Sequence, residues 1–296
     1  MPKKIDPAYR KLVEQVKVDG EKYAEDAMKP VYLEQKAAMG ELHDLIGKAY
    51  INHAKDGVIT LTTAQQRQLM TGMKSKLKAM GLKLGQSEID QVTLLLSSVF
   101  SSTYYKNAFV MESGLKANIK FNLLKKEFIQ AAVNAKYKGE FFSDRIWSNK
   151  AGMIDHLQDS LTKAMQGKMT IDKIGREIRD RFNVTAYESR RLVATETSRV
   201  QTRASIDIGK SSGVEQHMWS ATLDGKTSPE CAEQDGKLYD INDGGSPQMP
   251  LHPLDRCCWI NVPYEGWSPS ARKDNQSGEI IAYINYEDWA KAKGVN

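Results

Sequence analysis

Residues 219–259 read WSATLDGKTSPECAEQDGKLYDINDGGSPQMPLHPLDRCCW, and this stretch differs in character from everything before it. It contains all three cysteines of the chain, at positions 231, 257 and 258, together with His252. Two Asp–Gly pairs, at 224–225 and 235–236, are typical turn signals. The stretch therefore predicts short strands joined by turns, and it is where we expect chemistry or binding to concentrate.

Before Val214, apolar residues recur at the i, i+3, i+4, i+7 spacing of amphipathic helices. The sequence thus predicts an α+β, predominantly α-helical protein, with a long N-terminal helical region followed by a small β-rich C-terminal module. We divide it into an N-terminal helical region (1–140), a second helical segment (141–213), a small α+β module with the Cys/His motif (214–264) and a tail with a strand and a short helix (265–296).

Polar caps and glycines set the expected helix ends. Thr62 or Thr63, with Gln65 or Gln66 three residues on, can form a capping box. Gly81 is expected to end the helix that this box opens, and the helical pattern continues from Leu115 to Asn134. Further helix starts are expected at Ser87, Ser143, Thr170, and Thr185 or Ser189.

From Val214 onward the expected elements are short. Ser228 and Pro229 favour a helix start, because serine caps well and proline suits the first helical position. Strands are expected at 216–222, 237–239, 258–262 and 280–284, with loops at 242–250 and 266–278 and a closing helix near 286–289.

Composition restricts the class of protein. A chain of 296 residues can form one large or two ordinary domains, and 41% hydrophobic residues argue against global disorder. Three cysteines do not suggest a disulfide framework and fit a reducing compartment. No secretory signal is seen, and the longest apolar run, 92–100, is too short to span a bilayer. We therefore expect a protein made in the cytosol, without a membrane partner.

Positive charge is concentrated between residues 115 and 150, where eight Lys or Arg face three Asp or Glu, although the whole chain carries a net charge of only +5. Such a stretch either meets phosphate or an acidic partner, or is an ordinary solvated helix face. The lysines concerned are Lys116, Lys120, Lys125, Lys126, Lys136 and Lys138.

A polar motif lies in the last long helical segment. Arg191, Thr195 and Arg199 share one helix face, and Glu196 lies three residues before Arg199. One interpretation is an exposed surface with ion pairs worth about 0.3–0.5 kcal/mol each. The other is that these four residues attach the helix to the module that follows.

Thiol and imidazole groups in the module suggest a metal site. Cys231, His252, Asp255 and Cys257 provide sulfur, nitrogen and oxygen donors of the kind that zinc prefers in tetrahedral sites. The alternative is that the cysteines are buried core residues and that His252 hydrogen-bonds a loop. The sequence leaves both interpretations open, so zinc is the one cofactor that we consider.

Three stretches, in this order, resemble the Mu F-like head morphogenesis family, the minor head proteins of tailed bacteriophages. They are RLVATET (191–197), WSATLDGKTSPECAEQDGK (219–237) and PLHPLDRC (250–257). FSDRIW (142–147), SGEIIAY (277–283) and YEDW (286–289) are similar to the same family, so the resemblance covers roughly residues 140–290.

This chain departs from the family pattern at two positions. Members often show Thr-Cys-Pro-x-Cys and, later, His-Pro-x-Cys-Arg-Cys; here Ser228 and Asp255 stand at two of those cysteine positions. The resemblance therefore fits a module held by packing and hydrogen bonds, in which a metal is optional. The remaining motif residues are Trp219 and four expected turn and cap formers, Asp224, Thr227, Asp235 and Gly236.

The resemblance implies a structural protein of the virion rather than an enzyme. Family members act in head assembly, DNA packaging or genome delivery, inside the capsid near the portal. It implies the portal protein and other head or scaffold proteins as partners, and the bacterial host cytoplasm as the site of assembly. The basic stretch would make non-specific contacts with packaged DNA.

Two other functions remain open. The module could be a small nuclease or toxin-like enzyme domain that uses His217 or His252 with Asp224 or Glu230 as an acid–base pair. A general DNA-binding module is the other, and its affinity would fall steeply with salt.

Overall fold

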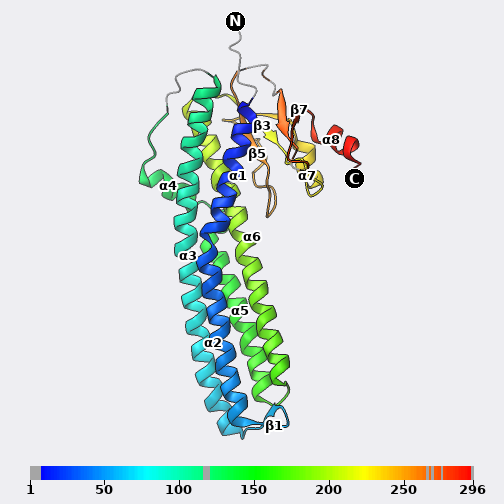
Figure 1. Cartoon of the computed structure of the whole chain (residues 1–296). Coiled ribbons are helices and arrows are strands. Elements are labelled where there is room, and N and C mark those ends of the chain that lie inside the picture. Colours follow the sequence, from blue (N-terminus) through cyan, green and yellow to red (C-terminus); the bar gives the residue numbers. More distant parts are fainter. Residues whose placement is uncertain (1–7, 116–120, 265–266, 268–269, 275, 295–296) are drawn as a thin grey trace. The chain divides into compact units, whose positions relative to one another are not determined.

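The computed structural model describes residues 8–115, 121–264, 267, 270–274 and 276–294. It is an α+β protein, mostly helical, with small strand-containing elements in the C-terminal part, as predicted (Figure 1). The helices are α1 (Tyr9–Ala27), α2 (Lys29–His53), α3 (Thr63–Leu115), α4 (Lys126–Val133), α5 (Phe142–Met165), α6 (Ile171–Ser211), α7 (Pro229–Gln234) and α8 (Tyr286–Lys293).

The strands form three small antiparallel sheets. The central one has the order β4-β3-β5, and its register places Trp219 opposite Trp259 and Ser220 opposite Cys258. Its strands are β3 (Gln216–Ser220), β4 (Leu238–Asp240) and β5 (Cys258–Val262); the two hairpins are β1 (Ala54–Lys55) with β2 (Val58–Ile59), and β6 (Ala271–Lys273) with β7 (Ile280–Ala282). The β1–β2 hairpin and β6 were not predicted from the sequence.

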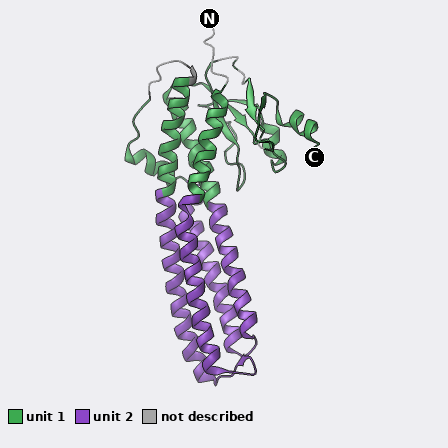
Figure 2. Ribbon diagram, in the orientation of Figure 1, with its two compact units in different colours: residues 1–25, 95–135, 193–296 green, residues 26–94, 136–192 purple. Residues whose placement is uncertain are grey.

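Contacts divide the chain into two compact units, each made of segments distant in the sequence (Figure 2). Unit 1 contains residues 1–25, 95–135 and 193–296, and unit 2 contains residues 26–94 and 136–192. Long helices supply residues to both units, because α3 and α6 each cross a boundary in the sequence. The division into four consecutive segments stays a prediction.

Three expected helix boundaries, at Gly81, at Ser87 and at Thr185 or Ser189, are wrong because α3 and α6 continue through them. Gly81 lies inside α3, where a Cβ atom would come within 2.7 Å of the Ile154 side chain on α5. A glycine within a helix costs only about 1 kcal/mol, and this close approach requires it. Ser87 likewise lies within α3, and Thr185 and Ser189 lie within α6.

The hydroxyls of Thr185 and Ser189 show why they do not begin a helix. They donate to the backbone carbonyls of Arg181 and Thr185, at 3.0 and 3.1 Å, so each serves the preceding turn of its own helix. Ser143 also does not cap α5, which begins at Phe142. The expected helix from Leu115 to Asn134 is wrong over residues 121–125, which precede α4.

Other caps are confirmed. Thr62 and Gln65 form the expected box: the Thr62 N–H donates to the Gln65 amide oxygen at 3.0 Å, and the Gln65 N–H donates to the Thr62 hydroxyl at 3.4 Å. The Thr170 hydroxyl accepts from the Lys173 N–H at 3.4 Å at the start of α6. Local sequence signals therefore placed these starts correctly.

Unit 2 has an apolar core built from α2, α3, α5 and α6, with members such as Leu42, Leu77, Leu157 and Ile178. A buried polar group accompanies this core. The Glu88 carboxylate on α3 pairs with the Lys150 ammonium on α5 at 2.5 Å, and Gln35 on α2 donates to the Ser189 hydroxyl at 3.1 Å. No described helix combines the length and the apolar content that a membrane span requires.

Candidate functional site

The candidate site surrounds Cys231 in unit 1. Ser228 caps α7 as expected, and its hydroxyl accepts from the Cys231 N–H at 3.2 Å. This cap places Cys231 in the first turn of α7, with its side chain in a small core that also contains Trp219, Met249 and Trp259. The thiol is therefore held on a short, well-anchored helix and is almost completely buried.

His252 approaches this thiol from the loop after β4. Its Nε2 lies 3.3 Å from the Cys231 Sγ and 3.0 Å from the Ser228 hydroxyl oxygen. Its Nδ1 lies 3.0 Å from the backbone carbonyl of Pro253, which can only accept, so Nδ1 carries the proton. In the neutral imidazole, Nε2 therefore presents a lone pair towards the thiol, as a metal ligand would.

Asp255 completes the group. Its Oδ1 lies 3.7 Å from the Cys231 Sγ and accepts from the Cys257 N–H at 2.9 Å. Its Oδ2 accepts from the Leu251 N–H, also at 2.9 Å. The carboxylate thus organises the loop that carries His252. The two N–H groups in turn stabilise its negative charge, which would be costly to bury without hydrogen bonds.

The spacing of these donors fits zinc. Ligand atoms of Cys231, His252 and Asp255 all lie within 4.8 Å of one another. Zinc bonds of about 2.3 Å to sulfur and about 2.0 Å to nitrogen place those two atoms roughly 3.5 Å apart in a tetrahedral site. The distances from the Cys231 sulfur, 3.3 Å to nitrogen and 3.7 Å to oxygen, lie on either side of that value.

The fourth candidate ligand, Cys257, lies beside Cys231. A hydrogen bond from the Cys257 side chain lowers the pKa of Cys231 to about 7 and raises the pKa of Cys257. Burial opposes protonation of His252, but its bond to Pro253 and the adjacent Cys231 raise its pKa. The lowered pKa of Cys231 favours its thiolate, which is the form that binds zinc.

A second polar group, around Asp235, holds the module together. Its carboxylate pairs with the Arg272 guanidinium on β6 at 2.6 Å, and both side chains are 1% exposed. It also accepts from the N–H groups of Ala221 and Tyr286, each at 2.8 Å. Asp235 therefore accepts hydrogen bonds from three separate segments of the chain, so its role is wider than forming a turn.

Arg272 is a residue that sequence analysis missed. Its guanidinium also donates to the backbone carbonyls of Ala221 at 2.6 Å and Ile284 at 2.9 Å. It lies in a stretch rich in Gly, Ser and Pro that was expected to be a loop. An arginine between Ala271 and Lys273 offered no signal of its own.

Other motif residues make local contacts. Asp224 forms a two-pronged ion pair with Arg256, and the Thr227 hydroxyl donates to the Thr222 carbonyl. Gly236 has a φ of +79°, and a Cβ atom there would lie 2.8 Å from the Tyr283 hydroxyl. Turn chemistry and close approach therefore both require glycine at this position.

Comparison with known proteins shows which families this chain resembles. The family described as Phage Mu protein F like protein matches residues 155–260, which include α6 and the Cys231 group. The resemblance to the Mu F-like family is confirmed. Minor head protein GP7 of Bacillus phage SPP1 is 20% identical over 271 residues, covering 86% of this chain and 88% of that protein. The family match and the similarity to this minor head protein together support a structural role in the phage head.

A second relative carries a different name. The NAD(+)--arginine ADP-ribosyltransferase EFV of Enterococcus faecalis is 25% identical over 202 residues, 63% of this chain. The match covers 41% of that protein, so the chain spans about two fifths of its length. No solved structure matches the Mu F-like chain significantly.

The four motif residues on α6 have different roles. The Thr195 hydroxyl accepts from the Leu254 N–H at 3.1 Å, so it links α6 to the loop of His252. Arg199 pairs with Glu196 at 2.6 Å and donates to the carbonyls of Ala132 and Val133. Both charged side chains are buried, so this pair is not the exposed one considered above; Arg191 is exposed.

The acid–base pair considered for an enzyme is not assembled in the described part of the chain. His217 stacks on Trp259 with ring centroids 3.8 Å apart, and its Nε2 contacts the Ser246 hydroxyl. Burial lowers the pKa of His217 to about 4, whereas a general base works best near the operating pH. His252 contacts Cys231, Asp224 pairs with Arg256, and Glu230 is exposed.

The proposed DNA-contacting lysines do not all fall in one unit. Lys125 and Lys126 lie in unit 1 and are exposed, next to and at the start of α4. Lys136 and Lys138 lie in unit 2, also exposed. Lys116 and Lys120 lie outside the described residues.

Proposed function

We propose that this Mu F-like protein is a minor head protein that binds the portal inside the phage capsid. There it would act with other head or scaffold proteins in head assembly, DNA packaging or genome delivery. The similarity to Minor head protein GP7 along 88% of that protein supports the assignment. Assembly would take place in the host cytoplasm, before the protein is enclosed in the virion.

The observation that carries a partner-binding role is a set of exposed apolar side chains on α3, on α4 and in the segment just before α4. We call it the α3–α4 surface: Phe109, Leu123 and Phe128, whose exposed fractions are 69%, 77% and 62%. The Leu124 N–H donates to the Tyr105 hydroxyl at 2.9 Å, and Phe109 lies one helical turn after Tyr105. The segment before α4 is thus held on the face of α3 that presents Phe109.

Exposed apolar surface of this kind marks an interaction site. An apolar surface on the portal would fit these three side chains best. Because these side chains contact little of their own protein, they can be changed without disturbing the fold.

We expect the double variant Leu123→Ser/Phe128→Ser to lose most of its association with the portal. Coexpression with the portal from the same genome, followed by purification of the ring, measures the amount of bound protein. We expect the amount of bound protein to fall at least about tenfold. A tenfold change in affinity corresponds to about 1.4 kcal/mol, which is modest for two apolar side chains at an interface.

Leu33→Ser is the matched control, since Leu33 is 66% exposed but lies on α2. Unchanged circular dichroism in all variants would show that folding is intact. Full retention of the double variant on the portal ring would contradict the role of the α3–α4 surface. No complex with the unchanged protein would contradict portal binding itself.

We also propose that Lys125 and Lys126 contact packaged DNA through phosphates, without reading base sequence. Replacing both by glutamate should weaken binding to a random double-stranded fragment. The slope of log affinity against log salt should fall by about 1.8, since each phosphate contact contributes about 0.9. Lys226→Glu/Lys237→Glu, which changes two exposed lysines of the C-terminal module, is the control, and equal effects in both variants would exclude a specific surface.

We propose, third, that the Cys231 group binds a structural zinc ion, with Cys231, His252 and Asp255 as ligands and Cys257 as the fourth. The zinc ion would cross-link α7 to the loop that carries His252. Elemental analysis of protein purified without chelators should find close to one zinc per chain. Cys231→Ser should lose it.

Cys258→Ser is the control for the zinc experiment. Cys258 is the first residue of β5, and its thiol lies near the Ser220 and Glu14 side chains rather than near His252, so it should not reach the ion. Protein without zinc, or equal zinc in both variants, would leave the group as a core held by hydrogen bonds.

A further inference from the structure

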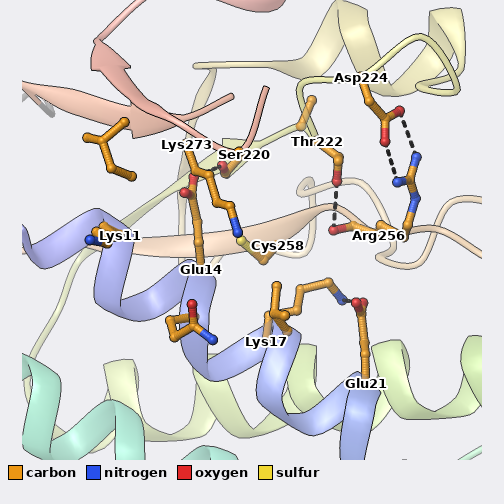
Figure 3. A pocket seen from close by; sticks show the side chains of 15 residues that line it. Lys11, Glu14, Lys17, Glu21, Ser220, Thr222, Asp224, Arg256, Cys258 and Lys273 are labelled. Carbon is orange, nitrogen blue, oxygen red and sulfur yellow. Dashed lines mark hydrogen bonds and ion pairs between the residues drawn. The ribbon is translucent and has the colours of Figure 1, made fainter. Parts of the chain in front are cut away.

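A polar cavity of about 310 Å³ lies within unit 1, away from the α3–α4 surface. Side chains of α1 form one wall, and the end of β3, the start of β5 and the β6–β7 hairpin form the others (Figure 3). Its volume is at the lower end of the roughly 300–1,000 Å³ typical of small-molecule sites. Neither the zinc proposal nor portal binding uses this cavity.

Each carboxylate at the cavity already has a cation of its own. Glu14 accepts from the buried Arg10 guanidinium at 2.9 Å, and Glu21 pairs with the Lys17 ammonium at 3.4 Å. Asp224 is held by Arg256, as Figure 3 shows. These internal pairs neutralise the acidic groups, so they do not attract a cation from solution.

Two ammonium groups at the cavity remain without a carboxylate. Lys11 on α1 and Lys273 on β6 both line it, and within the described part of the chain neither forms an ion pair. They come from opposite walls, which the fold brings together from positions more than two hundred residues apart in the sequence. Lys11 is exposed and Lys273 is half-buried, so water solvates both ammonium groups, and an anion in the hollow would gain Coulomb attraction from each of them.

We propose that this cavity binds the dianionic phosphate group of a small ligand, with Lys11 and Lys273 as its two charge partners. A dianion matches both ammonium groups, whereas a single carboxylate would leave one of them uncompensated.

Calorimetric titration of the full chain with inorganic phosphate, at constant ionic strength, tests the proposal. We expect saturable binding that weakens at least tenfold in Lys273→Gln and in Lys11→Gln. Lys237→Gln, which removes an exposed lysine outside the cavity, should bind as the unchanged protein does. Absence of binding to the unchanged protein, or equal weakening in all three variants, would overturn the site.

Two further competition experiments distinguish the phosphate of a small molecule from the phosphate at a DNA end. A mononucleotide should compete with inorganic phosphate if the natural ligand is a small molecule. A 5′-phosphorylated oligonucleotide that competes, beside a 5′-hydroxyl oligonucleotide that does not, would indicate a DNA end. Portal association of Lys273→Gln, measured in parallel, separates failure of this site from failure of the proposed head function.

Discussion

Replacing Asp235 by alanine is expected to lower the free energy of unfolding by about 3–5 kcal/mol, because it leaves a buried guanidinium without its counter-ion. Arg272 and Asp235 are each 1% exposed, so water cannot replace the missing carboxylate. The N–H groups of Ala221 and Tyr286 would lose their acceptor as well. Chemical denaturation monitored by tryptophan fluorescence measures the loss, since Trp219 and Trp289 lie in this part of the chain.

Asp224→Ala is the matched control for this prediction. Asp224 also forms a two-pronged pair with an arginine, Arg256, but the two side chains are 17% and 39% exposed. Solvent can hydrate Arg256 when its partner is removed, so a loss of about 1 kcal/mol or less is expected. Similar losses in the two variants would show that burial of the Asp235–Arg272 pair is not what stabilises the module.

Glu88→Gln should have a comparable effect in unit 2, again about 3–5 kcal/mol, because Lys150 would keep its charge in a buried position. The Lys150 and Glu88 side chains are 3% and 1% exposed, and they join α5 to α3. The substitution preserves shape, so lost packing contributes little and the charge is the variable tested. Thermal unfolding followed by circular dichroism gives the measurement, since unit 2 is almost entirely helical.

Asp159→Asn provides the control, because the Lys163–Asp159 pair has the same nitrogen–oxygen distance, 2.5 Å, and lies on the same helix, α5. Its side chains are 49% and 62% exposed, so the expected loss is below about 0.5 kcal/mol. The two variants therefore compare a buried and an exposed pair at the same nitrogen–oxygen distance. A large effect of Asp159→Asn, or a small one of Glu88→Gln, would contradict this account.

The residues of the candidate metal site could be proposed from the sequence because cysteine and histidine are rare here and their chemistry is distinctive. Cys231, His252 and Asp255 lie within 25 residues of one another, and the structure brings their donor atoms together. Arg272 and Arg256 could not be proposed in this way. Arginine is common, and its importance depends on which carboxylate the fold places beside it.

Helix boundaries show the same limit. The capping box at Thr62 and Gln65 involves only neighbouring residues, and it formed as predicted. Gly81 carried a stop signal, but the helix runs through it, because Ile154 on another helix packs where a Cβ atom would lie. A glycine in a helical pattern can indicate either the end of the helix or a close approach by another element. Only the tertiary structure distinguishes the two.

The sequence by itself therefore determined the helical class, the strands β3, β4, β5 and β7, the caps at Thr62, Thr170 and Ser228, and the resemblance to Mu F-like proteins. These depend on periodicity and on motifs whose meaning is local or carried by the order of residues along the chain. Tertiary structure alone decided which charges are buried in pairs, as for Asp235 with Arg272, and which remain uncompensated, as for Lys11 and Lys273. The physical reason is that burial and charge pairing depend on distances between segments far apart in the chain, which no local pattern encodes.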